Sequence, residues 1–334
     1  MTETTNKKLI SLVVPCYNES EAFSHLQTAI VSLLDSMEEK YRVEVVLVDD
    51  GSRDSTWKRI QSFAQADRRV RGVALSRNFG HQLALTCGYD CAQGDAVACM
   101  DADLQDPPEV VRELIAKWEE GYDVVHAVRI RREGETRFKL WTAAFFYRLI
   151  RFLGAAHVKA NAGDFRLMSR QALDALHRMP EQHRFVRGMV GWVGFRTTEV
   201  HYERKARIAG ETKYPFRKMI RFAVDAIVSF SIIPLRISFA SALLLSTAIL
   251  GYLAYAAGKY ALFNAPLVPG WSSLIIAIVA LGCMNLVCLG ILGEYVGRIY
   301  EQVKQRPLYI VQESTSQNAI EPGPPANGQF KVDA

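Results

Sequence analysis

Short runs of consecutive apolar residues alternate with amphipathic stretches from Leu9 to Ala127. Such runs are typical of strands buried on both faces of a sheet, and the stretches between them are long enough for helices. Because strands separated by helices usually pair in parallel, the pattern predicts an α/β domain whose parallel sheet is covered on both faces. The predicted strands are Leu9–Pro15, Val43–Val48, Val70–Leu75, Ala96–Met100 and Asp123–Ala127. The first predicted helix ends at about Met37, the second covers Thr56–Ala66, the third covers Gly80–Gln93 and the fourth begins at about Pro108.

Two longer apolar segments follow, and residues 237–258 and 271–293 contain no charged side chain. About 20 apolar residues suffice to cross the hydrocarbon core of a bilayer, so both segments are predicted to be transmembrane helices. The connecting loop, residues 259–270, carries one basic residue, whereas several basic residues precede the first apolar segment and follow the second. This asymmetry predicts that the loop is extracytoplasmic and that the head and the C-terminus are cytoplasmic. The flanking cations are Arg217, Lys218, Arg221, Arg236, Arg298, Lys304 and Arg306.

The remaining segments divide into a head, residues 1–215, a juxtamembrane amphipathic helix, 216–236, and a tail, 294–334. The tail is rich in Pro, Gly, Asn and Ser near its end and is predicted to be disordered from about residue 314. Within the head, residues 138–154 place aromatic side chains at helical spacing beside Lys and Arg, which suits a helix lying in the membrane interface. The alternative for this segment is an amphipathic helix packed on the domain core.

Composition excludes several classes of protein. The 334 residues are 49% hydrophobic and 22% charged, which is typical of a folded chain. The net charge of +5 is small, and no Lys/Arg block interleaved with aromatics is present, so a nucleic-acid partner is not expected. The six cysteines form no C-x-x-C pair and have no zinc-like His spacing. They are predicted to be free thiols in a reducing compartment.

Acidic residues follow two of the predicted strands: Asp49–Ser52 comes after the second, and Asp101-Ala102-Asp103 after the fourth. Ligands of parallel sheets bind beyond the carboxyl ends of the strands. No glycine-rich dinucleotide or phosphate-binding loop is present, so a divalent cation would have to neutralise any bound phosphates. Asp101 and Asp103 could reach one cation, with Gln105 as a third oxygen donor, and such ligands suit Mg²⁺ or Mn²⁺. The alternative is a pair of solvated turn residues.

These acidic motifs, together with Val14-Pro15-x-Tyr17-Asn18-Glu19 and the continuation to Pro108, resemble glycosyltransferase family 2. The most similar branch is that of the polyprenyl-phosphate glycosyltransferases, which includes dolichol-phosphate mannose synthases and bactoprenol glucosyltransferases. The resemblance covers about residues 9–310 and implies a GT-A-type, Rossmann-like α/β head with interfacial helices and two C-terminal transmembrane helices. Further segments that resemble this branch are Leu75–Gly80, Gly163–Met168, Arg184–Gly188 and Gly293–Arg298.

The resemblance implies a nucleoside diphosphate sugar as donor. Asp49 is expected to organise its turn rather than to touch the donor, and Asn18 or Ser20 could also cap the following helix. Lys213, with Arg204 and Arg207, would belong to a mobile loop that closes over the donor. The residues expected to bind the nucleotide sugar are Pro15, Tyr17, Glu19, Val48, Asp50, Ala102 and Lys213.

The same resemblance assigns the metal and the reacting groups. Asp101, Asp103 and Gln105 would hold Mg²⁺ or Mn²⁺ against the diphosphate leaving group. Asp101, Asp103 and Asp164 are expected to be the catalytic carboxylates, with the role of Asp164 left open between positioning and support of Arg166. The histidines His81, His126 and His183 are predicted to be structural.

The implied acceptor is a polyprenyl phosphate at the bilayer surface. A phosphate monoester is largely dianionic at neutral pH, so its oxygen can attack without a dedicated general base. Arg129 and Lys139 match the positions that hold this phosphate in the family, and Arg131 and Arg137 could assist. Ala143 stands where many relatives have a serine that contacts the phosphate, which leaves that contact unassigned.

The predicted function is an inverting transfer of a hexose, with UDP-glucose and undecaprenyl phosphate favoured, at the cytoplasmic leaflet of a bacterial inner membrane. One alternative is a processive polysaccharide synthase, which the small number of predicted helices disfavours. A second is a membrane scaffold that binds a nucleotide sugar without turnover. Glycines in the second apolar segment could also pack against another copy of the chain, which predicts a homo-oligomer. These glycines are Gly282, Gly290, Gly293 and Gly297.

Overall fold

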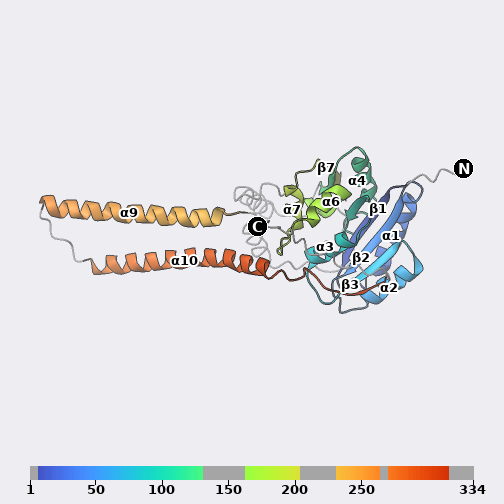
Figure 1. Cartoon of the computed structure of the whole chain (residues 1–334), viewed down its shortest axis with the longest axis horizontal. Helices are drawn as coiled ribbons and strands as arrows, with labels where there is room; N and C mark the ends of the chain where they lie inside the picture. Colours follow the sequence, from blue (N-terminus) through green and yellow to red (C-terminus); the bar gives the residue numbers. More distant parts are fainter. Residues whose placement is uncertain (1–6, 131–161, 204–230, 264–269, 316–334) are drawn as a thin grey trace, which may run out of the picture. The chain divides into compact units, whose positions relative to one another are not determined.

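The computed structural model describes residues 7–130, 162–203, 231–263 and 270–315. These residues belong to two compact units, of which the first contains the head together with the chain from Arg306 onward. The second unit contains two long helices (Figure 1). The predicted interfacial helix at 138–154 lies outside the described residues, as does the juxtamembrane helix at 216–236 up to residue 230.

The head is built on one eight-stranded sheet with the strand order β7-β5-β6-β4-β1-β2-β3-β8. Its first five strands agree closely with the predicted ones, and β1 pairs in parallel with both β2 and β4. The prediction of a parallel sheet is corrected by β6, which runs antiparallel to β4 and β5, and by β8, which runs antiparallel to β3. The strands are β1 (Leu9–Cys16), β2 (Arg42–Asp49), β3 (Val70–Leu75), β4 (Ala96–Cys99), β5 (Val124–Arg129), β6 (Ala162–Ser169), β7 (Thr197–Tyr202) and β8 (Val311–Ser314).

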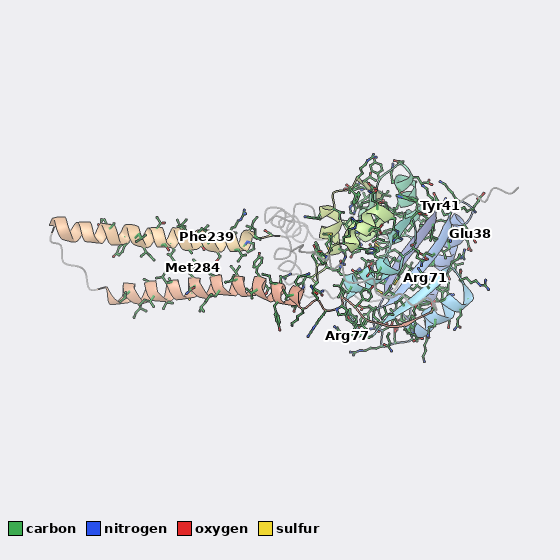
Figure 2. The ribbon with its side chains drawn as sticks, viewed as in Figure 1. Glu38, Tyr41, Arg71, Arg77, Phe239 and Met284 are labelled. Atoms are coloured by element: carbon green, nitrogen blue, oxygen red, sulfur yellow. The ribbon has the colours of Figure 1, made fainter. Side chains whose placement is uncertain are left out.

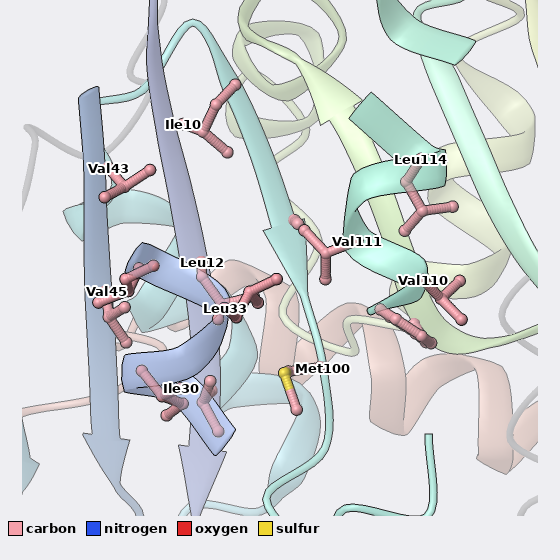
Figure 3. Packing of buried hydrophobic residues seen from close by; sticks show 14 of the residues in the cluster. Ile10, Leu12, Ile30, Leu33, Val43, Val45, Met100, Val110, Val111 and Leu114 are labelled. Atoms are coloured by element: carbon pink, nitrogen blue, oxygen red, sulfur yellow. The ribbon is translucent and has the colours of Figure 1, made fainter. Parts of the chain in front are cut away.

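Helices cover both faces of this sheet, as predicted. On one face, Leu12 of β1 belongs to a buried cluster with Ile30 and Leu33 of α1 and with Val111 and Leu114 of α4 (Figure 3). Burying aliphatic side chains of this size stabilises the fold by roughly 1.5–3 kcal/mol each. The helices of the head are α1 (Phe23–Met37), α2 (Thr56–Ala66), α3 (His81–Cys91), α4 (Val110–Glu119), α6 (Arg170–His177) and α7 (Val186–Trp192).

Helix α3 packs closely against the other face of the sheet, and one glycine permits this. A Cβ atom added to Gly88 would lie 2.1 Å from Cγ1 of Val13 and 3.3 Å from Cγ2 of Val48. Only glycine can therefore occupy this position without moving the helix away from β1 and β2. The close packing places the first residue of α3, His81, near the carboxyl ends of these strands.

The second unit consists of α9 (Ile233–Phe263) and α10 (Trp271–Val303), which lie side by side (Figures 1 and 2). At 1.5 Å per residue these helices are about 45–50 Å long, more than the roughly 30 Å of a hydrocarbon core. Ile233–Tyr252 and Ala277–Val303 are apolar enough to span a membrane and are not buried within the protein. The hydroxyl of Ser241 on α9 lies 3.8 Å from the sulfur of Met284 on α10.

Candidate functional site

The predicted acidic residues meet at one edge of the sheet because of strand direction. Strands β1, β2, β4 and β5 all end at this edge, whereas β6 begins there. Cys99 of β4 is paired with Arg166 of the antiparallel β6. Continuing this register by two residues brings Asp101 opposite Asp164, although the two are far apart in the sequence. The topology therefore places two of the predicted catalytic carboxylates together.

Asp164 is buried, and its carboxylate accepts hydrogen bonds from two arginines and one side-chain amide. Arg187 donates from Nε to Oδ1 at 2.9 Å and from Nη2 to Oδ2 at 2.8 Å. Arg166 donates to Oδ1 at 3.2 Å, and the amide of Gln82 to Oδ2 at 3.1 Å. Burial raises the pKa of Asp164, but His81 and the two arginines hold that pKa well below its usual range. A carboxylate kept ionised with its lone pairs occupied is suited to positioning its neighbours rather than to accepting a proton.

His81 lies between the two carboxylates. Its Nε2 is 3.3 Å from Oδ2 of Asp164 and 3.7 Å from Oδ1 of Asp101. Burial lowers the pKa of His81, but the two carboxylates outweigh this effect and raise it above its ordinary value. From the sequence, a structural role was expected for this histidine. The signal that could have singled it out is its position directly after the family-like segment Leu75–Gly80.

The residues predicted to bind a metal lie on the loop that follows β4. The backbone N–H of Gln105 donates to Oδ1 of Asp103 at 3.2 Å, and Leu104 between them has a positive φ of 52°. Burial raises the pKa of Asp101; His81 lowers it, but the negative charges of Asp164, Asp106 and Asp103 act against His81 and the pKa stays above its ordinary value. Carboxylate oxygens gathered on one loop are the ligands that Mg²⁺ and Mn²⁺ prefer.

In the part of the chain that the structure describes, no three His, Cys, Asp or Glu side chains are grouped so that they alone could hold a metal ion. Mg²⁺ and Mn²⁺ do not require such a group, because one or two carboxylates suffice when substrate phosphates complete the coordination shell. Asp101 and Asp103 with Gln105 fit that kind of site.

Asp50, a predicted nucleotide-binding residue, is 3% exposed and holds a neighbouring loop. Its carboxylate accepts from the backbone N–H groups of Phe79 at 2.7 Å and Gly80 at 3.0 Å, and from the side-chain amide of Asn78 at 3.0 Å. Gly51 has a φ of +66°, and a Cβ there would lie 2.3 Å from the backbone of Arg77. The loop after β3 therefore fits closely onto the turn after β2.

The loop after β1 is tied to the same turn. The side-chain oxygen of Asn18 accepts from the N–H of Arg53 at 2.9 Å, and Thr56 Oγ1 accepts from the N–H of Glu19 at 2.9 Å. Asn18 and Ser20 therefore do not cap the following helix, since α1 begins at Phe23 with Ala22 as its N-cap. As expected, Asp49 organises its turn by accepting from the N–H of Ser52 at 3.2 Å.

The expected donor residues differ in how far they are accessible. Pro15, Val48 and Ala102 are buried, so they could contact a ligand mainly through their backbone or at the site wall. Tyr17 is 43% exposed and Glu19 is half-buried, which leaves their side chains accessible at the same edge. Stacking of a base on an exposed aromatic ring is a common form of recognition.

Asp54 joins the loop after β1 to the turn after β2. We expect Asp54→Ala to lower the free energy of unfolding by about 1–2 kcal/mol at pH 7. Its carboxylate accepts from the N–H and hydroxyl of Thr56, at 3.0 and 2.6 Å, and from the N–H of Ser20 at 3.1 Å. Partial burial raises the pKa of Asp54, but these hydrogen bonds outweigh it and lower the pKa to about 2.

Because this folded-state pKa lies below the unfolded value of about 3.9, the stabilisation is present above about pH 4 and is lost as the pH falls towards 2. Denaturant unfolding of wild type and Asp54→Ala at pH 7 and pH 3 should show a difference that shrinks at pH 3. Glu39→Ala, at an exposed turn, is the control. A difference that stays constant or grows on acidification would contradict this assignment.

Arg129, predicted to bind the acceptor phosphate, is the last residue of β5 and lies at the same edge of the sheet. Its Nε donates to the hydroxyl of Tyr202 at 3.0 Å, and its Nη2 lies 3.4 Å from both carboxylate oxygens of Asp106. The hydroxyl of Tyr202 donates in turn to Asp106, which is fully buried. Burial lowers the pKa of Arg129, but Asp106 and Tyr202 raise it above its ordinary value. Arg129 is therefore a fixed cation attached to the acidic loop after β4.

Several predicted site residues lie outside the described residues, so their assignments remain predictions. Arg131, Lys139 and Lys213 are the three that the sequence analysis placed in the binding sites. The others are Arg137, Ala143, Arg204 and Arg207. Four residues that contact the predicted site residues were not assigned a role from the sequence: Arg187, Gln82, Asp106 and Tyr202.

Two solved structures are similar to part of this chain. The structure of glucosyl-3-phosphoglycerate synthase from Mycobacterium tuberculosis with Mn²⁺, uridine diphosphate and glucosyl-3-phosphoglycerate matches with a TM-score of 0.48 and 17% identity, covering 66% of this chain and 78% of that chain. Mannosyl-3-phosphoglycerate synthase from Rubrobacter xylanophilus matches with a TM-score of 0.46 and 18% identity, covering 66% and 73%.

Comparison of sequences extends over nearly the whole chain. The family model described as "Glycosyl transferase family 2" matches residues 11–176. The uncharacterized glycosyltransferase YkcC of Bacillus subtilis is 46% identical over 305 residues, covering 91% of this chain and 93% of that protein. The SfII prophage-derived bactoprenol glucosyl transferase of Shigella flexneri is 40% identical over 305 residues, covering 91% and 98%. With these similarities over nearly its whole length, the chain belongs to glycosyltransferase family 2.

Proposed function

We propose that the protein transfers one hexose, with glucose from UDP-glucose favoured, to undecaprenyl or a similar polyprenyl phosphate. The observation that carries this proposal is the 40% identity to bactoprenol glucosyl transferases over 98% of their length, a match that includes the two long apolar helices. Bactoprenol is a polyprenol, so the names of these relatives describe glucosyl transfer to such a lipid. The acidic loop beside the fixed cation Arg129 suits a reaction between two phosphate-bearing substrates.

The proposed reaction needs no protein base. The dianionic lipid phosphate supplies the nucleophilic oxygen, which attacks the anomeric carbon as the bond from that carbon to the nucleoside diphosphate breaks. Direct attack from the opposite side inverts configuration, so an α-linked donor gives a β-linked lipid product. Asp164, saturated by Arg187, Arg166, Gln82 and His81, supports this scheme because its lone pairs are already occupied.

Asp101 and Asp103, with Gln105, would hold Mg²⁺ or Mn²⁺ at this site. When bound, the cation would neutralise charge on the nucleoside diphosphate as it leaves. The residues of the chain contribute orientation: Asp50 holds the loop after β3, and Asp54 joins the loops after β1 and β2. These loops carry Tyr17 and Glu19, which would contact the base and ribose.

We also propose that α9 and α10 cross the cytoplasmic membrane as a hairpin, with the head and the chain after α10 on the cytoplasmic side. The pairing of β8 with β3 supports the proposal that both ends of the hairpin lie on the same side of the membrane, because the chain that leaves α10 returns to the sheet of the head. An even number of crossings is then required. The basic residues at the outer ends of both helices support the cytoplasmic assignment.

Arg129→Ala is expected to weaken use of the lipid phosphate by roughly 10–100-fold, because a hydrogen bond to a charged group contributes about 1.5–3 kcal/mol. The measurement is the KM for polyprenyl phosphate at saturating nucleotide sugar, alongside the KM for the nucleotide sugar. Arg112→Ala, an exposed arginine on α4, is the matched control and should leave both values unchanged. A variant that loses donor affinity while keeping normal dependence on the lipid would move Arg129 to the donor side of the site.

The test of the proposed donor and stereochemistry uses membranes that contain the protein. They are incubated with a panel of radiolabelled UDP- and GDP-sugars, and the lipid product is extracted and its anomeric configuration determined. We expect a β-linked glucosyl lipid from UDP-glucose. An α-linked product, or labelled polymer in place of a single-sugar lipid, would contradict the proposed reaction.

A further inference from the structure

Residues 306–315, here called the C-terminal strap, follow α10 after two residues and contain β8, which pairs with β3 at the edge of the sheet (drawn in red in Figure 1). Val73 is paired with Ser314 and Leu75 with Val311. The N–H of Thr315 donates to the carbonyl of Gly72 at 3.0 Å, and the hydroxyl of Thr315 accepts from the N–H of Gly72 at 2.9 Å. The strap therefore covers the outer edge of the sheet along most of β3.

Side chains of the strap also contact two helices of the head. The carboxylate of Glu313 accepts from the indole N–H of Trp57 at 2.9 Å and from the amide of Gln61 at 2.7 Å, both on α2. The hydroxyl of Tyr309 donates to Asp90 on α3 at 2.6 Å. The strap is thus held by β3, α2 and α3, and in each of these contacts the two residues are more than 200 positions apart in the sequence.

The strap contacts the chain on both sides of the loop that Asp50 holds. At the start of this loop, the carbonyl of Ile310 accepts from the N–H of Ser76 at 2.9 Å. After the loop comes α3, which begins at His81 and carries Asp90, the partner of Tyr309. Between these two points, residues 77–80 form the turn whose N–H groups donate to Asp50.

We propose that the C-terminal strap is a positioning element of the donor site. By fixing Ser76 and α3, it holds residues 77–80 on Asp50 and sets the place of His81 beside Asp101 and Asp164. This inference rests on the proposed function, in which Asp50 and Asp101 belong to the site of the nucleotide sugar. The ten residues of the strap, which follow the second apolar helix in the chain, would then complete the donor site. Binding of the donor would in this way depend on the segment attached to the membrane-spanning hairpin.

The experiment compares two truncations of the full chain purified in detergent. A stop codon after Gln305 removes the strap, whereas a stop codon after Thr315 keeps it and is the matched control. Binding of UDP in the presence of Mn²⁺ is measured by calorimetry, and hydrogen exchange is measured for peptides that cover Ser76–His81 and, separately, β5. We expect removal of the strap to weaken UDP binding by about tenfold or more, the effect of losing one or two net hydrogen bonds.

Hydrogen exchange distinguishes positioning from a general loss of stability. Removal of the strap should accelerate exchange at Phe79 and Gly80 while β5 stays protected, and the truncation after Thr315 should match the wild type in both measurements. If the shorter protein does not fold, Tyr309→Phe combined with Thr315→Val is measured in the same way, with the exposed Tyr300→Phe on α10 as control. Wild-type UDP affinity and wild-type protection of residues 76–81 in a folded strap variant would overturn the proposal.

The outcome for the proposed function is separate. If the wild type binds neither UDP nor another nucleoside diphosphate, the proposed donor is wrong, and hydrogen exchange then still decides whether the strap positions residues 77–80. If the wild type binds UDP and a folded strap variant matches it both in UDP affinity and in protection of residues 76–81, the proposed function stands and the role of the strap is refuted.

Discussion

Asp103→Ala is expected to abolish sugar transfer while leaving a folded protein with both long helices. Asp103 lies on the loop after β4, where its Oδ1 accepts the N–H of Gln105 at 3.2 Å, so the loss of stability should be only about 1 kcal/mol. The loss of activity should be far larger. Neutralising charge on a departing phosphate contributes several kcal/mol, and we therefore expect transfer to fall by about a thousandfold or more.

The measurement combines transfer with metal binding. Mn²⁺ binding in the presence of UDP should weaken in Asp103→Ala and stay normal in Glu113→Ala, an exposed carboxylate on α4 that serves as the control. A chelator should inactivate the wild type, and added Mg²⁺ or Mn²⁺ should restore it. Normal Mn²⁺ binding by Asp103→Ala, or wild-type transfer in excess chelator, would remove Asp103 from the metal site.

Asp164→Ala is expected to have the largest effect on stability. Arg166 is 1% exposed and pairs with Asp164, so removal of the carboxylate leaves a buried charge without that partner. Breaking a buried ion pair in this way costs about 3–5 kcal/mol. Arg187 and His81 would also lose the acceptor that orients them, so transfer should fall even in protein that remains folded.

Asp164→Asn separates shape from charge, because it keeps the size of the side chain. We expect it to be folded but destabilised and poor at transfer. In a double-mutant cycle with Arg187→Gln, the two losses should be less than additive, because both substitutions disrupt one bidentate pair. Additive losses, or wild-type stability of Asp164→Ala, would show that Asp164 is not the centre of this network.

The GT-A-type α/β head is confirmed, and its first five strands could be predicted because each is a short apolar run followed by a polar turn. The three strands that were missed lack that signal. β6 carries Asp164 and Arg166 inside the sheet, and its polar residues belong to the network at the site. β8 has the sequence Val-Gln-Glu-Ser, and its pairing with β3 depends on a contact between distant parts of the chain. Local propensity cannot predict a strand of this kind.

Dependence on contacts between distant parts of the chain also explains which roles in the site could not be predicted. Asp101 and Asp103 could be found because they follow a buried strand and are close in the sequence. The role of His81 between Asp101 and Asp164 depends on the antiparallel insertion of β6, which the prediction of a parallel sheet did not include. Asp50 was expected to face the donor, and the structure adds that its carboxylate holds Phe79 and Gly80. Residues at functional sites often depart from local rules in this way.

The measurement that tests the central claim most directly is the requirement for the acceptor phosphate. Purified protein is incubated with radiolabelled UDP-glucose and Mg²⁺, and with undecaprenyl phosphate, with the corresponding alcohol undecaprenol, or without lipid. We predict a labelled single-sugar lipid only with undecaprenyl phosphate, and no such product from Asp103→Ala under the same conditions. Equal labelling of undecaprenol, or label that accumulates in polymer without added lipid phosphate, would contradict the account.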